Sequence, residues 1–443
     1  MLEGKLLKVI FIVALPQVVT MLIDSLYNMA DAFFVSGLGE TAIAAVGIND
    51  SLMMIIRAIS LGFGMGSASF ISRALGAKRD EDASRAATTT LFTSIAVLGI
   101  LAVLGSVFLE PLVNLLGATD SVRPYSMDYA RWILMSAPVT SAVIVLAQVL
   151  RGEGSTAFSM VGNVAGCVIN VALDPIFITV LGMGVAGAAI ATSISKVISM
   201  LILLWPFIMN RCVMQLKFSY FSPTKEIYSE IAKMGIPTMI RTGMMSISTI
   251  LINNIAAGFG DAALAAISIA NRTMRLVSSA VAGFSMGYQP IAGYCWGAKK
   301  YGRALKSFFY TMAIGGIIGL VLGAGLAVFA KQTIRIFSGG SEVMDLGLIL
   351  IRSQSIMLIP HVYVLIISGF FQALGEGLKA GVLGLSRQLF VLIPCVLILS
   401  HLFGAVGLAY SQAASDLLSF LMSAIMVIPL IRKMISLRQL SAE

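Results

Sequence analysis

Five aspartates stand inside long apolar stretches of this sequence, where an acidic side chain needs a specific reason to be. They are Asp24, Asp31, Asp50, Asp174 and Asp416. An ionised carboxylate at membrane depth costs at least about 2.5–3.5 kcal/mol, so each acid needs a partner, a water-filled cavity or a proton. An acidic side chain at membrane depth is therefore suited to binding a cation or carrying a proton.

Two of these acids are expected at the same depth. Asp31 lies six residues and Asp174 eight residues before a glycine turn, and Thr192 lies eight residues after one. At 1.5 Å per residue, all three are about 9–12 Å below one membrane surface. Asn170 and Tyr27 each stand one helical turn from an acid and on its face. This set predicts a site for H⁺ or Na⁺, and the alternative is a structural hydrogen-bond network.

The remaining acids have less defined roles. Asp24 is seven residues from Asp31, so it lies on the same helix side and about 10 Å deeper. It either faces a central cavity and attracts a cationic ligand, or pairs with Arg57 of the second span. Asp416 is predicted to pair with Arg387 across the last two spans.

The composition indicates that the helices carrying these acids lie in a lipid bilayer. Hydrophobic residues are 58% of the 443, about 257, and charged residues are 12%, against about 25% in soluble domains. At about 20 residues per span, this allows roughly twelve helices. Long unbroken apolar runs such as 314–329 exclude a β-barrel, whose strands alternate. The predicted fold class is an all-α, polytopic membrane protein.

Several other functions are not supported by the sequence. The net charge of +9 is spread in small groups rather than along a stripe, so nucleic acid is not an expected partner. The four cysteines show no metal-ligand spacing. The Gly-x-Gly-x-x-Gly pattern at 182–187 joins two spans rather than a strand and a helix, so it does not indicate a dinucleotide site. No Walker, HExxH or GxSxG motif occurs, so we expect neither ATP use nor an enzyme.

Twelve spans can be placed along the chain. Lysine and arginine cluster before the first span and after the second, sixth, eighth and twelfth spans, as is typical of cytoplasmic loops. We therefore expect an inner-membrane protein with both termini in the cytoplasm. The predicted spans are 9–35, 43–71, 87–109, 127–150, 158–181, 185–209, 230–257, 263–292, 305–330, 348–373, 378–402 and 406–431.

The second half of the chain repeats the first. Positions 15–79 align without gaps on positions 236–300, with many identities, and Pro16 falls on Pro237. Six spans per repeat give both halves one orientation, which predicts two pseudo-symmetric six-helix bundles around a central cavity. The predicted domains are an N-lobe (1–209), which carries the cation-coupling site, a cytoplasmic linker (210–229) and a C-lobe (230–443).

These features resemble the multidrug and toxic compound extrusion (MATE) family over nearly the whole chain. Gly-Ala-Lys follows both the second and the eighth spans, as in that family. The most specific matching segments are Tyr27-Asn28-Met29-Ala30-Asp31, Asn170-x-x-x-Asp174-Pro175 and Gly184-Val185-Ala186-Gly187-Ala188-Ala189-Ile190-Ala191-Thr192.

The resemblance implies roles for individual residues. The implied cation-coupling site consists of Tyr27, Asp31, Asn170, Asp174 and Thr192, with a helix hinge at Pro16. The implied substrate cavity includes Met21, Asp24 and Gln148, and we also assign Asn253 and Gln289 to it. Because Asn253 and Asn254 stand where some branches carry an acid in the seventh span, no C-lobe sodium site is expected.

The predicted function is secondary active multidrug efflux. Cationic amphipathic compounds are expected to leave the cell by alternating access in exchange for H⁺, or for Na⁺ bound at the cation-coupling site. No cofactor is expected besides that ion, and the expected partners are the lipid bilayer and small organic cations. The alternative is a lipid-linked saccharide flippase of the wider superfamily, which commonly has fourteen spans and a cationic cavity.

Overall fold

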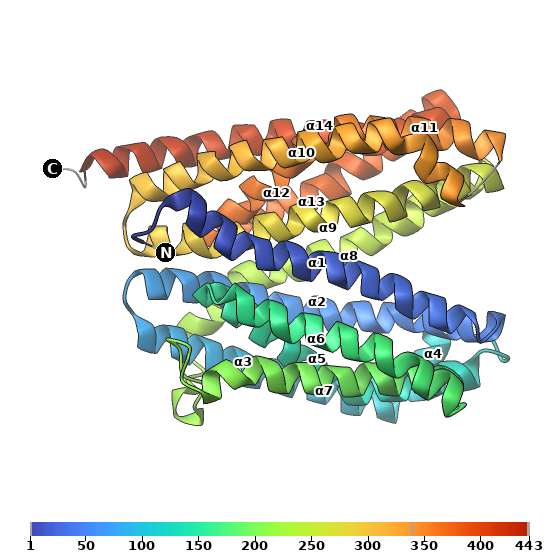
Figure 1. Ribbon diagram of the computed structural model, residues 1–443, viewed down its shortest axis with the longest axis horizontal. Coiled ribbons are helices and arrows are strands. Elements are labelled where there is room, and N and C mark those ends of the chain that lie inside the picture. Colours follow the sequence, from blue (N-terminus) through green and yellow to red (C-terminus); the bar gives the residue numbers. More distant parts are fainter. Residues whose placement is uncertain (1, 338–339, 441–443) are drawn as a thin grey trace. The chain divides into compact units, whose positions relative to one another are not determined.

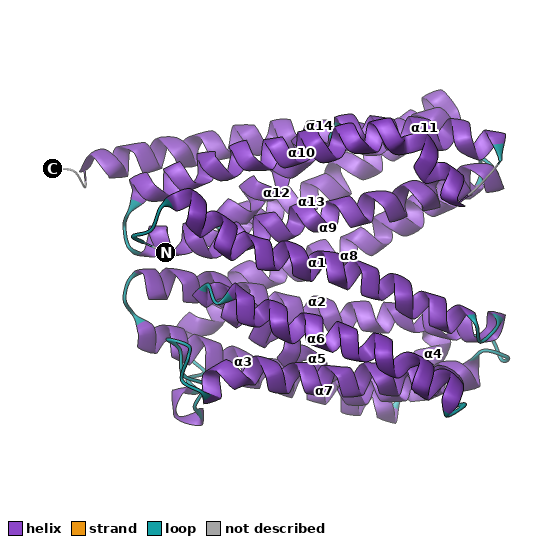
Figure 2. Ribbon diagram, viewed as in Figure 1, coloured by secondary structure: helices purple, strands orange, loops and turns teal. Residues whose placement is uncertain are grey.

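The computed structural model describes residues 2–337 and 340–440, except for the side chains of residues 29, 31–33, 35, 36, 40 and 337. Within this part of the chain, every regular element is a helix (Figure 2). The predicted all-helical membrane fold is confirmed. Each of the first ten predicted spans coincides with one described helix or with two consecutive ones, and the last two lie within the stretch Gly377–Leu440.

Eight described helices are long and apolar enough to cross a membrane, or nine if one bent pair is a single span. One of the eight, Gly377–Leu440, is 64 residues long, which at 1.5 Å per residue is about three times the hydrocarbon thickness. It turns back at Gly404, whose φ of 60° and ψ of −141° are not helical. Two long helices, Lys225–Ala257 and Asp261–Gly297, are not among these eight.

The helices form two compact units. Unit 2, Val19–Met239, and unit 1, Met1–Val18 with Ile240–Glu443, each have an internal core. Figure 1 labels the elements within them. Unit 2 contains α2 (Glu40–Gly76), α3 (Asp80–Val107), α4 (Leu109–Leu115), α5 (Arg123–Glu153), α6 (Thr156–Pro175), η1 (Ile176–Val180), α7 (Gly184–Ile208) and η2 (Phe218–Tyr220). Unit 1 contains α9 (Asp261–Gly297), α10 (Tyr301–Phe337), α11 (Ser341–Ile356), α12 (Leu358–Ala373), α13 (Gly377–Leu385), η3 (Ser386–Leu392) and α14 (Ile393–Leu440).

Two helices are divided between the units. In α1 (Leu6–Ser36) the first part belongs to unit 1 and the rest to unit 2, whereas in α8 (Lys225–Ala257) the order is reversed. The divisions fall two residues after Pro16 and Pro237. Proline removes a backbone donor and bends a helix, so each helix changes unit at a natural bend point.

The internal repeat is visible in the backbone. Because left-handed conformations favour glycine and mark sharp turns, their positions show where each half of the chain turns. Eight of the eleven left-handed residues in the described chain recur at equivalent positions of the two repeats, in the pairs Gly39 and Gly260, Lys78 and Lys299, Gly154 and Gly375, and Gly182 and Gly404. The two halves of the chain therefore place their turns equivalently.

Glycines allow the divided helices to pack closely. A Cβ added at Gly283 of α9 would lie 2.7 Å from the carbonyl oxygen of Gln17 in α1, within unit 1. In unit 2, a Cβ added at Gly235 of α8 would lie 2.7 Å from the carbonyl oxygen of Gly62 in α2. Small residues of this kind let helix backbones approach each other in lipid.

We expect Gly283→Ala to lower the thermal stability of the detergent-solubilised protein by about 1–3 kcal/mol, since the added methyl group overpacks this contact. The matched control is Gly325→Ala in α10, where a Cβ would meet nothing within 4 Å. Thermal unfolding followed by size-exclusion chromatography compares the two. Equal stability of both variants would contradict the close contact.

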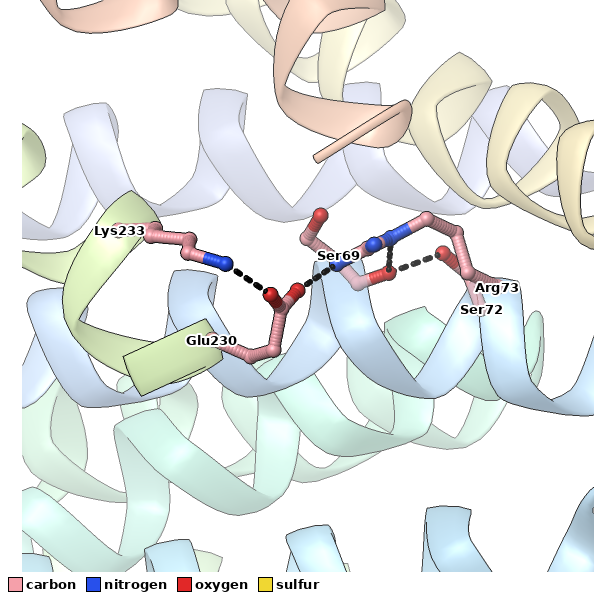
Figure 3. Close-up of polar contacts among 5 residues, drawn as sticks. All are labelled: Ser69, Ser72, Arg73, Glu230 and Lys233. Atoms are coloured by element: carbon pink, nitrogen blue, oxygen red, sulfur yellow. Dashed lines mark hydrogen bonds and ion pairs between the residues drawn. The ribbon is translucent and has the colours of Figure 1, made fainter. Parts of the chain in front are cut away.

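Polar contacts hold the first part of α8 on unit 2 (Figure 3). Arg73 of α2 donates to Glu230 at 2.8 Å, and Lys233 donates to the other oxygen of Glu230 at 2.5 Å. Arg73 also donates to the carbonyl oxygen of Ser69 at 3.2 Å. The carboxylate of Glu230 therefore bridges two helices.

The polar linker is bound to the same unit. Glu153 at the end of α5 accepts a hydrogen bond from the backbone N–H of Val213 at 2.7 Å. Thr89 of α3 accepts one from the N–H of Ser222 at 3.0 Å. The rings of Phe218 and Phe221 stack with their centroids 5.8 Å apart. The linker is therefore an ordered part of unit 2.

Candidate functional site

Three of the five predicted cation-coupling residues meet in unit 2. The side-chain amide of Asn170 donates to Asp174 at 3.3 Å and lies 3.3 Å from the hydroxyl oxygen of Thr192. Asp174 is 0% exposed, Asn170 1% and Thr192 5%. An amide, a carboxylate and a hydroxyl thus converge in a site shielded from bulk solvent.

The local sequence explains how these groups are brought together. Asn170 and Asp174 are four residues apart on α6, so they lie on one helix face. Pro175 interrupts the helix, and the chain continues as the π-helix η1. A Cβ at Gly187 of α7 would lie 2.6 Å from the carbonyl oxygen of Phe177. This close approach lets α7 present Thr192 beside α6.

The other two predicted coupling residues lie in α1. Tyr27 is half-buried. Asp31 belongs to the helix, but its side chain lies outside the described residues. The participation of both residues in the site remains a prediction.

Asp24 lies among groups that the sequence did not link to it. The thiol of Cys167 on α6 is 3.4 Å from an Asp24 carboxylate oxygen. Asp24, Arg57 and Lys196 are close enough to interact electrostatically. No ion pair within 4.0 Å joins the described side chains of Asp24 and Arg57. Lys196 escaped sequence reasoning, although a lone lysine four residues after Thr192 in an apolar span was a usable signal.

The remaining predicted cavity residues have different surroundings. Met21 and Asn253 are half-buried in α1 and α8. Gln148 of α5 is buried, and its stem packs on Gly64 of α2. Gln289 of α9 donates to Gln372 of α12 at 3.2 Å. Their role in a substrate cavity stays a prediction.

The predicted pairing of Asp416 with Arg387 is confirmed. The Nε of Arg387 lies 2.7 Å from a carboxylate oxygen of Asp416, and Nδ1 of His361 lies 3.2 Å from the same oxygen. Both acid and histidine are buried. The participation of His361 was not predicted, because it depends on how α12 packs against α14.

Among the side chains that the structure describes, no group of three or more histidine, cysteine, aspartate or glutamate residues gathers to hold a metal ion. The cluster around Asp174 instead offers one carboxylate with neutral oxygen donors. Hard monovalent cations accept such mixed oxygen ligands, and a proton needs only the carboxylate.

Comparison with known proteins shows the family of the chain. The MatE family model matches residues 16–176 and again residues 237–397. The two matches begin at Pro16 and Pro237, the prolines that the internal repeat pairs, and together they cover more than half of the chain. The chain belongs to the MATE family of efflux transporters.

Individual MATE relatives agree over nearly the full length. The chain is 26% identical over 423 residues to the multidrug export protein MepA of Staphylococcus saprophyticus, covering 95% of this chain and 92% of the relative. It superposes with a TM-score of 0.92 and 27% identity on an outward-facing multidrug resistance MATE transporter, covering 98% and 97% of the two chains.

A third similar structure is a transporter of the MOP superfamily from Pyrococcus furiosus. The TM-score is 0.88 and the identity is 28% over 97% of both chains. Its description attributes to that protein a binding pocket of reversed polarity and a different function.

Proposed function

We propose that this multi-pass membrane transporter exports small amphipathic organic cations across the plasma membrane in exchange for H⁺ or Na⁺. The observation that carries the proposal is the buried cluster of Asn170, Asp174 and Thr192 in unit 2. Membership of the MATE family and similarity to multidrug export proteins support the substrate class. Both termini are proposed to lie in the cytoplasm.

The coupling ion would bind where Asp174 and Asn170 present their oxygens, with Asp31 and Tyr27 of α1 completing the site. With Pro16 as the proposed hinge of α1, ion binding to the second part of the helix would change the direction of that part relative to the first. Antiport requires the ion-loaded state to release the drug and the ion-free state to bind it again.

The energetics limit this cycle. Moving a two-state equilibrium from 1:99 to 99:1 takes about 5.5 kcal/mol. One cation that moves down 100 mV supplies about 2.3 kcal/mol. A concentration gradient or a second ion must therefore contribute to each cycle.

The test of the proposed function is ion flux in proteoliposomes that contain only this protein. Adding a lipophilic cation on one side is expected to drive H⁺ or Na⁺ movement in the opposite direction, measured with a fluorescent indicator for each ion. Substrate-stimulated flux of neither ion would overturn the proposal.

The proposed hinge has its own test. We expect Pro16→Ala to straighten α1 and slow transport several-fold while leaving ion binding nearly unchanged, because the binding groups are untouched. Pro138→Ala is a control, since this proline also lies inside a helix, α5, but in a segment without a proposed motion. Equal effects of both substitutions on transport would contradict a specific hinge.

A further inference from the structure

The linker between the two repeats lies along the first part of α3. The backbone N–H of Gln215 donates to the hydroxyl oxygen of Ser84 at 3.1 Å. The hydroxyl oxygens of Thr93 and of Tyr228, in the first turn of α8, are 2.9 Å apart. The linker bond to α3 described above falls between these two contacts. The linker is therefore fixed beside residues 84–93 of α3.

The exposed face of α3 shows how deep this contact lies. Four of its exposed hydrophobic side chains, at 92, 100, 103 and 107, fall on one helix face, as lipid-facing residues do. Counted back from Val107 at 1.5 Å per residue, a hydrocarbon layer of about 30 Å ends at about residue 87. The charged residues of α3 all precede that position, and among them Arg85 is paired with Glu81 at 2.7 Å. The linker therefore contacts α3 where the helix leaves the hydrocarbon.

Three aromatic rings meet at this level. The ring of Phe92 lies edge-on to the stacked rings of Phe218 and Phe221 in the linker, with centroid distances of 5.5 Å and 6.3 Å. Phe218 is 74% exposed and Phe92 39%. Exposed apolar surface of this size is unfavourable in water and favourable in lipid. Because Phe92 stands on the lipid-facing side of α3, the three rings extend that apolar surface onto the linker.

The linker carries positive charge beside these rings. It contains three exposed basic residues, Arg211, Lys217 and Lys225, and one exposed acid, Glu226. No described carboxylate lies within 4.0 Å of the charged group of any of the three basic residues. Lys217 directly precedes Phe218, so its stem can follow the apolar surface while its ammonium group reaches the lipid headgroups. Basic residues beside an apolar face are typical of segments that lie on anionic membranes.

We propose that this surface, the linker patch, binds an anionic phospholipid. The patch consists of Phe92, Lys217, Phe218 and Phe221. The Lys217 ammonium group would pair with the lipid headgroup, and the three rings would contact the upper part of the acyl chains. The proposed cytoplasmic location of the linker fits this ligand, because the cytoplasmic leaflet carries the negative surface potential. The inference goes beyond the proposed export function and does not depend on the coupling ion.

A tryptophan in the linker patch reports its lipid contacts. Phe218→Trp keeps an aromatic ring at the most exposed position of the patch, and its added emission is measured against the wild type in bilayers of phosphatidylcholine. Lipids with brominated acyl chains quench a tryptophan that they touch. We expect brominated phosphatidylcholine and brominated phosphatidylglycerol both to quench this emission, because the patch faces lipid. At equal content in the bilayer, phosphatidylglycerol is expected to quench as a ligand bound about fivefold more tightly.

Substitution assigns this fivefold preference to Lys217. The preference corresponds to about 1 kcal/mol, the usual contribution of one basic residue at an anionic membrane surface. In the Phe218→Trp protein, Lys217→Gln is expected to lower the preference to less than about twofold, and Lys217→Arg to retain it. Lys433→Gln is the matched control, because Lys433 is an exposed lysine near the end of α14 and outside the patch.

Three results would overturn the linker patch. Added emission that neither brominated lipid quenches would place the ring in water. Equal quenching by both lipids would remove the preference for an anion. An equal loss of preference in Lys433→Gln and Lys217→Gln would assign it to the surface potential of the whole protein.

A second reporter position keeps the test independent of folding. If Phe218→Trp does not yield monodisperse protein, Phe92→Trp makes the same measurement from α3, on the other side of the ring contact. The export function is measured separately, as ion flux in proteoliposomes. Failure of the lipid preference therefore leaves the proposed export function standing, and failure of ion flux leaves the linker patch standing.

Discussion

Asp174→Asn is expected to reduce substrate-stimulated ion flux at least tenfold, because asparagine keeps the shape of the side chain but cannot carry a negative charge or a proton. Asp174 is completely buried, accepts a hydrogen bond from Asn170 at 3.3 Å, and is the one carboxylate among the three residues Asn170, Asp174 and Thr192. The measurement is H⁺ and Na⁺ flux in proteoliposomes after addition of a lipophilic cation. Asp31→Asn is expected to give the same loss.

The control for this prediction is Asp345→Asn, which neutralises an exposed acid of α11 in unit 1. Its flux should equal that of the wild type. The thermal stability of Asp174→Asn should fall by no more than about 1 kcal/mol, the usual net value of one hydrogen bond. Wild-type flux in the Asp174→Asn variant would remove the central support for ion coupling in unit 2.

The largest expected effect on stability belongs to Asp416. Asp416→Leu leaves the Arg387 guanidinium without its 2.7 Å partner and His361 without its 3.2 Å partner. Removing one member of a buried ion pair typically costs about 3–5 kcal/mol. We expect a correspondingly large loss of thermal stability in detergent, measured by loss of the monodisperse peak after heating.

The double substitution Arg387→Met with Asp416→Leu separates charge from packing. Replacing both partners of a buried pair with apolar residues is often neutral or stabilising. The double variant should therefore be more stable than Asp416→Leu alone. If both variants lose the same stability, the cost comes from packing around α14 and not from the unpaired charge.

Much of the helical architecture could be predicted because lipid imposes simple rules. Apolar length set the twelve spans, and the internal repeat anticipated the paired turns at Gly39 and Gly260. The pairing of Asp416 with Arg387 followed from the need of a buried acid for a partner. The cluster of Asn170, Asp174 and Thr192 followed from helix rise and from the glycine turns.

Other features depend on packing that local sequence does not encode. Arg151 is fully buried in α5, with an amino group 2.8 Å from the sulfur of Met65, and nothing in its sequence neighbourhood distinguishes it from an exposed helix-end arginine. The contact of Cys167 with Asp24 requires the rotation of α6 relative to α1 within unit 2.

The divided helices have a consequence for biogenesis. Residues 2–18 belong to the same compact unit as the described residues after 239, and unit 2 is complete only at Met239. During synthesis, the amino-terminal segment therefore leaves the ribosome long before its neighbours exist. Insertion must hold this segment in the bilayer without its final contacts until more than half of the polypeptide has been translated. Cutting the gene at the linker would separate each fragment from a helix segment that its own unit needs.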